Sequence, residues 1–135
     1  MKRREFLIST LFGSIALNMN LSVKEKLKTI PINHSFFDKR EDTEIAWLGM
    51  AGALINCRGK IIFIDPLISY DASNEICESG NRLLVPLPIT ADEVLKADIV
   101  CYTHADSDHF AEKTAKILNS RLAPTYISPG PVYES

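Results

Sequence analysis

The sequence has few cysteines, few histidines and no marked excess of either charge. Its 135 residues include three cysteines and three histidines, and the formal net charge is −2. Cys57, Cys77 and Cys101 show no C-x-x-C spacing, and an odd, sparse count excludes the disulfide framework of a small secreted scaffold. Because no Lys/Arg patch is interleaved with aromatic residues, we expect no binding to nucleic acid.

Long hydrophobic runs and sequence repeats are also absent. No run approaches the roughly 20 apolar residues that a permanent membrane-spanning helix needs. The composition is 46% hydrophobic and 24% charged, which is close to the usual globular balance and argues against disorder. The chain is therefore expected to hold one globular domain at most.

The N-terminal residues have the features of a targeting segment. Basic residues at positions 2–4 precede a mostly apolar run, Phe6–Leu17, as in a secretory signal. The string RREFL also resembles the twin-arginine export signal. We therefore expect residues 1–30 to be a signal segment that contacts the membrane transiently, and the protein to be exported to the periplasm or cell envelope. The alternative is an ordinary amphipathic N-terminal helix.

The remaining chain alternates between polar and apolar stretches. Residues 31–43 are polar, charged and interrupted by Pro31, which predicts a linker. Three short apolar runs, of which the third is rich in β-branched residues, then predict a strand meander, at 44–49, 53–57 and 61–65. A long irregular stretch follows up to Pro88.

Two units of helix and strand complete the expected order. Thr90 and Glu93 have the spacing of a capping box, which predicts a helix over 89–97. The apolar run 98–103 predicts a central strand buried on both faces. A second helix at 110–120 and a strand at 125–128 follow. The fold class is therefore α/β: a β-meander and then αβαβ.

A cluster of histidine and aspartate follows the buried strand. His104, Asp106, Asp108 and His109 form the string H-x-D-x-D-H, at the carboxyl end of a strand where ligands bind in α/β sheets. Imidazole and carboxylate groups are ligands for Zn²⁺, Mn²⁺ or Fe. In an extended loop, positions 104, 106 and 108 face one side and His109 the other, so one loop can serve two metal ions.

Asp108 has two possible roles. As a catalytic residue it would ligate one metal ion and take the proton of an attacking water. As a structural residue, Asp108 or Ser107 would cap the helix that begins near Phe110. The structural role leaves the paired histidines unexplained.

Three phrases of the sequence resemble the metallo-β-lactamase fold superfamily: WLGMAGALI, IIFIDP and DIVCYTHADSDHF. The closest likeness is to the branch of metal-dependent hydrolases that includes ascorbate-6-phosphate lactonase-like proteins. In the family signature T-H-x-H-x-D-H, the residues Thr103, His104, Asp108 and His109 match. Asp106 stands in place of the second histidine. This harder ligand would favour Mn²⁺ or Fe over Zn²⁺, and the alternative is a weakened first metal site.

The resemblance implies a fold and a reaction. Residues 44–135 would form the N-terminal half of an αββα sandwich, as a fragment of a longer enzyme. Two divalent ions, Zn or Mn, would be bound, the first by His104 and Asp106 and the second by Asp108 and His109. A metal-bound hydroxide would hydrolyse an ester, lactone or phosphoester of a small-molecule substrate. The alternative is a truncated, non-catalytic protein with a weak metal-binding site.

The resemblance also implies a role for Asp65. The family has an aspartate at this position that supports the metal-binding loop by hydrogen bonds and does not itself bind metal. The alternative for Asp65 is an aspartate that merely ends a strand before Pro66.

Overall fold

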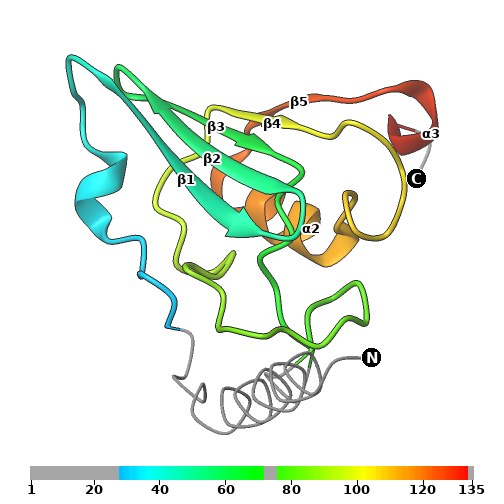
Figure 1. Ribbon diagram of the computed structural model, residues 1–135. Coiled ribbons are helices and arrows are strands. Elements are labelled where there is room, and N and C mark those ends of the chain that lie inside the picture. Colours follow the sequence, from blue (N-terminus) through cyan, green and yellow to red (C-terminus); the bar gives the residue numbers. More distant parts are fainter. Residues whose placement is uncertain (1–27, 72–75, 134–135) are drawn as a thin grey trace, which may run out of the picture.

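Residues 28–71 and 76–133 form a single mixed sheet with helical segments in a computed structural model (Figure 1). The five strands lie in the order β1-β2-β3-β4-β5. Their bounds are β1 Thr43–Gly49, β2 Gly52–Cys57, β3 Lys60–Ile64, β4 Ile99–Cys101 and β5 Thr125–Ile127. The helical elements in these residues are η1 His34–Phe37, α2 Glu112–Leu122 and α3 Gly130–Tyr133. The fold is thus mixed α/β, as the sequence predicts.

The first three strands form the predicted meander. β1, β2 and β3 are antiparallel neighbours, and each begins and ends within one residue of its predicted range. β2 and β3 are joined by Arg58 and Gly59, both with positive φ (51° and 87°). Positive φ at both central residues is the two-residue turn that matches strand twist. Parallel pairing of β3 with β4 and of β4 with β5 then extends the sheet.

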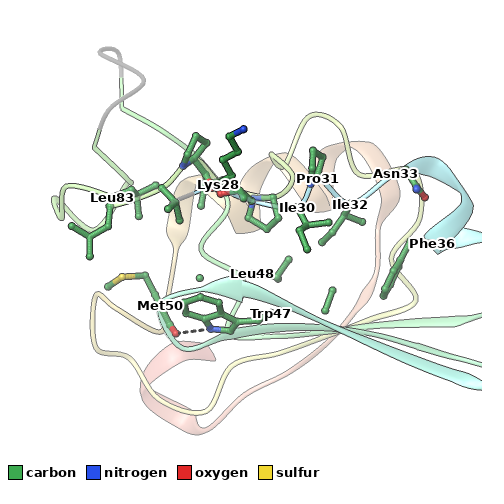
Figure 2. Close-up of a pocket in the computed structure, with 18 of the residues that line it drawn as sticks. Lys28, Ile30, Pro31, Ile32, Asn33, Phe36, Trp47, Leu48, Met50 and Leu83 are labelled. Carbon is green, nitrogen blue, oxygen red and sulfur yellow. Dashed lines mark hydrogen bonds between the residues drawn. The ribbon is translucent and has the colours of Figure 1, made fainter. Parts of the chain in front are cut away.

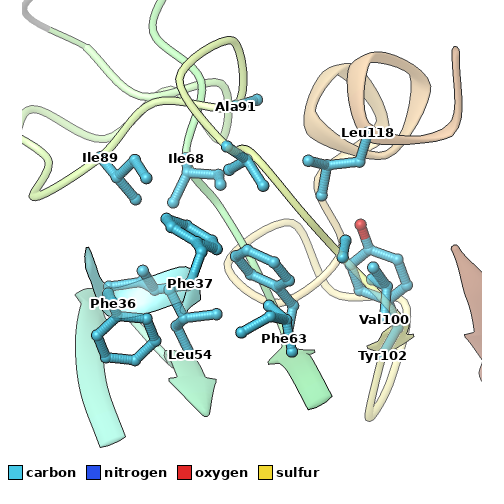
Figure 3. Packing of buried hydrophobic residues seen from close by; sticks show 14 of the residues in the cluster. Phe36, Phe37, Leu54, Phe63, Ile68, Ile89, Ala91, Val100, Tyr102 and Leu118 are labelled. Carbon is cyan, nitrogen blue, oxygen red and sulfur yellow. The ribbon is translucent and has the colours of Figure 1, made fainter. Parts of the chain in front are cut away.

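One face of the sheet is packed against α2 and the connecting segments. Leu54, Phe63 and Val100, on β2, β3 and β4, are fully buried in the same hydrophobic cluster as Leu118 of α2 (Figure 3). Two further core side chains, Phe36 and Phe37, come from η1. Residues 31–43, predicted as a linker, therefore contribute to the core.

The opposite face of the sheet is only half covered in the described part of the chain. Ile45, Ile55, Ile62 and Ile99 are cross-strand partners and form one continuous apolar row. Ile45 is 68% exposed, and the other three are partly exposed. The prediction that the fourth strand is buried on both faces is therefore wrong for the face that carries Ile99.

The predicted helix at 89–97 is also wrong. Thr90 and Glu93 form the capping contacts, with the Glu93 carboxylate 2.8 Å from both the backbone N and Oγ1 of Thr90. Only a turn forms, however, and residues 94–97 have no helical structure. The Ala91 carbonyl, which a helix would use internally, accepts a hydrogen bond from Arg121 Nη1 at 2.8 Å. Burial of Val94 and Ala97 stabilises the non-helical path.

The second helix is confirmed, shifted by two residues from its predicted range 110–120 to 112–122. No helix of the described residues is long and apolar enough to cross a membrane. The predicted signal segment, residues 1–30, lies outside the described residues except for its last three positions.

Candidate metal centre

The histidine–aspartate loop follows β4, beside the end of β3. Because β3 and β4 are parallel, their carboxyl ends lie at the same edge of the sheet. The backbone N–H of Asp65, directly after β3, donates to the carbonyl of Cys101, the last residue of β4, at 2.8 Å. Loop residues 103–110 then connect this edge to α2.

Asp65 is a buried anchor for the loop. It is 2% exposed, and its carboxylate accepts hydrogen bonds from the backbone N and Oγ1 of Thr103, both at 2.7 Å. His109 Nδ1 lies 2.9 Å from Asp65 Oδ2. Burial raises the pKa of the Asp65 carboxyl, but the hydrogen bonds from Thr103 and His109 outweigh it and hold the pKa below its ordinary value. Asp65 therefore supports the loop as a carboxylate, whereas a purely strand-ending aspartate would make no such contacts.

This anchor determines the tautomer of His109. An ionised carboxylate can only accept hydrogen bonds, so the proton of this contact lies on Nδ1 of His109. A neutral imidazole then has its lone pair on Nε2. Metal-binding histidines commonly donate their other N–H to a carboxylate in this way, which orients the ring and raises its basicity as a ligand.

His104 is oriented by the same carboxylate through Thr103. The Thr103 hydroxyl donates its single proton to Asp65, so it can only accept from His104 Nδ1, which lies 2.9 Å away. The lone pair of His104 is therefore also on Nε2. One buried aspartate thus holds both imidazoles in the tautomer that binds metal through Nε2.

Three of the four predicted ligands come together. His104, Asp108 and His109 each offer one ligand atom, and these atoms lie within 4.8 Å of one another. The two imidazole rings are adjacent, with centroids 3.7 Å apart, and Asp108 Oδ2 lies 3.8 Å from His109 Nε2. Two imidazole nitrogens and a carboxylate are a common ligand set for divalent transition metals. The group can hold a metal ion.

Asp106 lies outside this group of three. Its side chain is 78% exposed, with Oδ2 at 3.4 Å from His104 Nε2. Its carbonyl accepts from the backbone N–H of His109 at 2.9 Å and of Phe110 at 2.8 Å, which closes the turn that returns His109 toward Asp65. The predicted division into a His104–Asp106 pair and an Asp108–His109 pair differs from this grouping, because the turn brings His109 back beside His104.

Asp108 does not cap α2. The N-cap residue is Ala111, without a side-chain capping bond. Glu78 supplies the acceptors instead, with Oε1 at 2.9 Å from Lys113 N and Oε2 at 3.0 Å from Thr114 N. The Asp108 side chain remains half exposed at the metal cluster. The capping alternative for Asp108 is therefore wrong. The role of Glu78 could not be predicted from the sequence, because no local pattern links it to a helix 35 residues away.

No protein-family model matches the sequence, and no curated protein matches it either.

Proposed function

We propose that this chain is part of a metal-dependent hydrolase of the metallo-β-lactamase superfamily, acting on an ester, lactone or phosphoester of a small molecule. The observation that carries the proposal is the arrangement around Asp65. Two histidines from one loop are held by a single buried carboxylate with both Nε2 atoms available, next to the carboxylate of Asp108. A loop that served only to connect a strand to a helix would need none of these contacts.

The sheet gives independent support to the proposed fold. A two-sided apolar sheet needs a layer on each face, and in the part of the chain that the structure describes α2 and the connecting segments cover one face. The row Ile45, Ile55, Ile62 and Ile99 on the other face has the alternation expected of a sheet packed on a second sheet. In the proposed αββα sandwich, this sheet would be one of the two inner layers.

The donor set of the cluster fits a divalent metal ion. His104 and His109 would bind it through Nε2, and Asp108 through a carboxylate oxygen. The bound ion supplies Lewis acidity, which polarises a carbonyl or phosphoryl oxygen and lowers the pKa of water. We further propose that the metal is Zn or Mn and that a second ion binds nearby. Asp106 offers an additional carboxylate beside His104 for this second ion.

The residues of the chain would divide the remaining work. Asp108 is half exposed and has an oxygen near His109 Nε2, so it can take a proton from the attacking water as a general base. Asp65 would hold the two imidazoles during the reaction, through His109 directly and through Thr103 to His104. Export through the twin-arginine route, from the sequence of residues 1–30, remains part of the proposal.

The test is metal binding by variants of the cluster. His109→Ala removes one ligand, and Asp108→Asn weakens another without touching Asp65. We expect both to lower Zn²⁺ and Mn²⁺ affinity at least tenfold in equilibrium dialysis. His34→Ala is the matched control, because His34 is exposed on η1 and lies outside the cluster.

Two outcomes of these measurements would count against parts of the proposal. Unchanged metal content in both cluster variants, with native circular dichroism, would contradict the proposed site. Metal binding by the wild type without hydrolysis of any ester, lactone or phosphoester would favour the alternative, a non-catalytic metal-binding protein.

A further inference from the structure

A cavity among the described residues lies along β1, and the residues of the metal cluster are not among those that line it. It has a volume of ≈ 920 Å³, within the range of small-molecule binding sites. Trp47, Leu48 and Met50 form one side, and Ile30 and the neighbouring residues of segment 28–33 form the other (Figure 2). Segment 81–88 closes it at the end near Leu83. This cavity is called the β1 cleft below.

The β1 cleft exposes large apolar side chains to water. Ile30 is 87% exposed, Leu84 91% and Trp47 70%, and all three line the cleft. Apolar surface concentrated in a concave site indicates a ligand, because isolated apolar residues on a surface do not gather in this way. The ligand is therefore expected to be largely apolar.

The walls of the cleft favour a hydrocarbon chain over a peptide. Pro31, Pro86 and Pro88 line it, and proline has no N–H to offer to a peptide carbonyl. The carbonyl of Pro88 already accepts from Ile32 N at 2.8 Å, and that of Pro86 accepts from Thr29 Oγ1. The three prolines offer no N–H to a peptide carbonyl, whereas an acyl chain has no polar groups to satisfy along this wall.

The shape of the cleft also suits an extended chain. It follows β1 from Glu44 to Met50, a span of about 20 Å at 3.3 Å per residue. Figure 2 shows Trp47 lying along this strand, with its indole Nε1 bonded to the carbonyl of Met50 at 3.1 Å. That bond satisfies the polar atom of the indole, so the rest of the ring is left as an apolar surface.

The connection between β1 and β2 contacts both the β1 cleft and the support of the metal cluster. Gly49, the last residue of β1, and Met50, in the turn that follows, line the cleft. Gly52, the first residue of β2, packs on Asp65 so closely that a Cβ at Gly52 would lie 3.0 Å from the Asp65 carbonyl oxygen. Asp65 in turn holds His109. The residues at one end of the cleft and the anchor of the proposed metal centre are therefore linked through the β1–β2 connection.

We propose that the β1 cleft binds the unbranched acyl chain of the substrate, whose ester or lactone group lies at the metal cluster. The placement of the ester or lactone group at the metal cluster rests on the proposed function, whereas the binding of an acyl chain in the cleft does not. The substrate class is thus an acyl ester or acyl lactone with a medium-length chain.

The first test uses Trp47, the only tryptophan of the chain, as a fluorescent reporter. Butyrate, octanoate and decanoate, below their micelle concentrations, are titrated into the full-length protein with EDTA present, so that metal plays no part. We expect decanoate to shift Trp47 emission to the blue and to saturate. Affinity should rise by up to about fourfold per added methylene, and butyrate should have no effect.

Two variants make this titration specific. Leu84→Asp places a charge on the cleft wall at an exposed position and should weaken decanoate binding at least tenfold. Leu95→Asp is the control, because Leu95 is also exposed but does not line the cleft. No response of the wild type to decanoate would overturn the proposal, as would an equal response of Leu84→Asp. If other residues of the chain fill the cleft, the wild type will not respond to decanoate.

A second test separates the cleft from the proposed function. With metal added, kcat/KM for decanoyl esters should exceed that for butyryl esters at least tenfold, and Leu84→Asp should abolish the difference. Equal kcat/KM for both chain lengths would overturn the acyl-chain proposal. No hydrolysis of either ester, combined with saturable decanoate binding, would overturn the proposed function and leave the binding site standing.

Discussion

At the scale of single residues, Asp65 illustrates which parts of the candidate site can be predicted from sequence. The spacing of His104, Asp108 and His109 predicts a group of ligands, because residues within one short loop must lie near each other. The contact between Asp65 and His109 spans 44 positions and depends on the parallel pairing of β3 with β4. No pattern within either segment predicts it, and only the family resemblance led us to expect it.

Tyr102 is a second buried polar residue at this edge of the sheet. The residue is 4% exposed, and its hydroxyl has no hydrogen-bond partner among the described residues. The ring packs edge-on against Phe110 at 5.0 Å and stacks on Tyr126 at 6.3 Å. Burial, with smaller effects from neighbouring acidic groups, raises the pKa of Tyr102, so the phenol stays neutral.

We therefore expect Tyr102→Phe to leave the free energy of unfolding unchanged or to raise it by up to about 1 kcal/mol, because an unsatisfied buried hydroxyl is removed. Tyr126→Phe is the matched control. It deletes a hydrogen bond from the hydroxyl to the Ala115 carbonyl at 2.9 Å and should cost about 0.5–1 kcal/mol. Urea denaturation measures both. A loss of more than 1 kcal/mol in Tyr102→Phe would show that its hydroxyl has a partner.

At the scale of elements, the strands of the meander could be predicted and the segment between β3 and β4 could not. Alternating apolar residues and the Arg58–Gly59 turn are local signals, and local signals specify hairpins well. The predicted helix at 89–97 had an equally good local signal in Thr90 and Glu93. It was overridden by contacts from far along the chain, namely the bond from Arg121 to Ala91.

The entry to β4 depends on the charge of Asp98. Its Oδ2 accepts from the backbone N of Ile61 at 2.8 Å, and the ammonium groups of Lys96 and Lys60 lie within 3.2 and 3.3 Å of its carboxylate. Burial raises the pKa of Asp98, but the bond from Ile61 and the two lysines outweigh it, so the pKa lies below its ordinary value.

A pH dependence of stability follows from this lowered pKa. The unfolded chain, in which the pKa of Asp98 is about 3.9, binds the proton more tightly than the folded one. The stabilisation by ionised Asp98 is therefore fully present above that pH and is lost as pH falls through the folded pKa. We expect Asp98→Asn to be less stable than the wild type at pH 7 and the difference to shrink below about pH 4. A difference that stayed constant from pH 7 to pH 3 in urea denaturation would contradict this.

At the scale of the whole molecule, the sheet places polar chemistry at one edge and apolar surface on its outer face. Composition and pattern predict an α/β fold, and the structure has one. They do not predict which residues of irregular segments pack where. Phe36 and Phe37, in a stretch that is polar on average, are core residues, and Glu78 completes the N-terminus of α2 from a loop. Such contacts arise from tertiary packing and leave no periodic signal.

The account depends most on the ligands of the proposed metal ion, and X-ray absorption of the Zn-loaded protein tests them directly. We expect nitrogen and oxygen ligands at about 2.0–2.2 Å, with the outer-shell scattering of two imidazoles from His104 and His109. That result would support the anchored histidine pair. Sulfur at about 2.3 Å, or a spectrum without imidazole, would place the metal elsewhere and contradict the proposed centre.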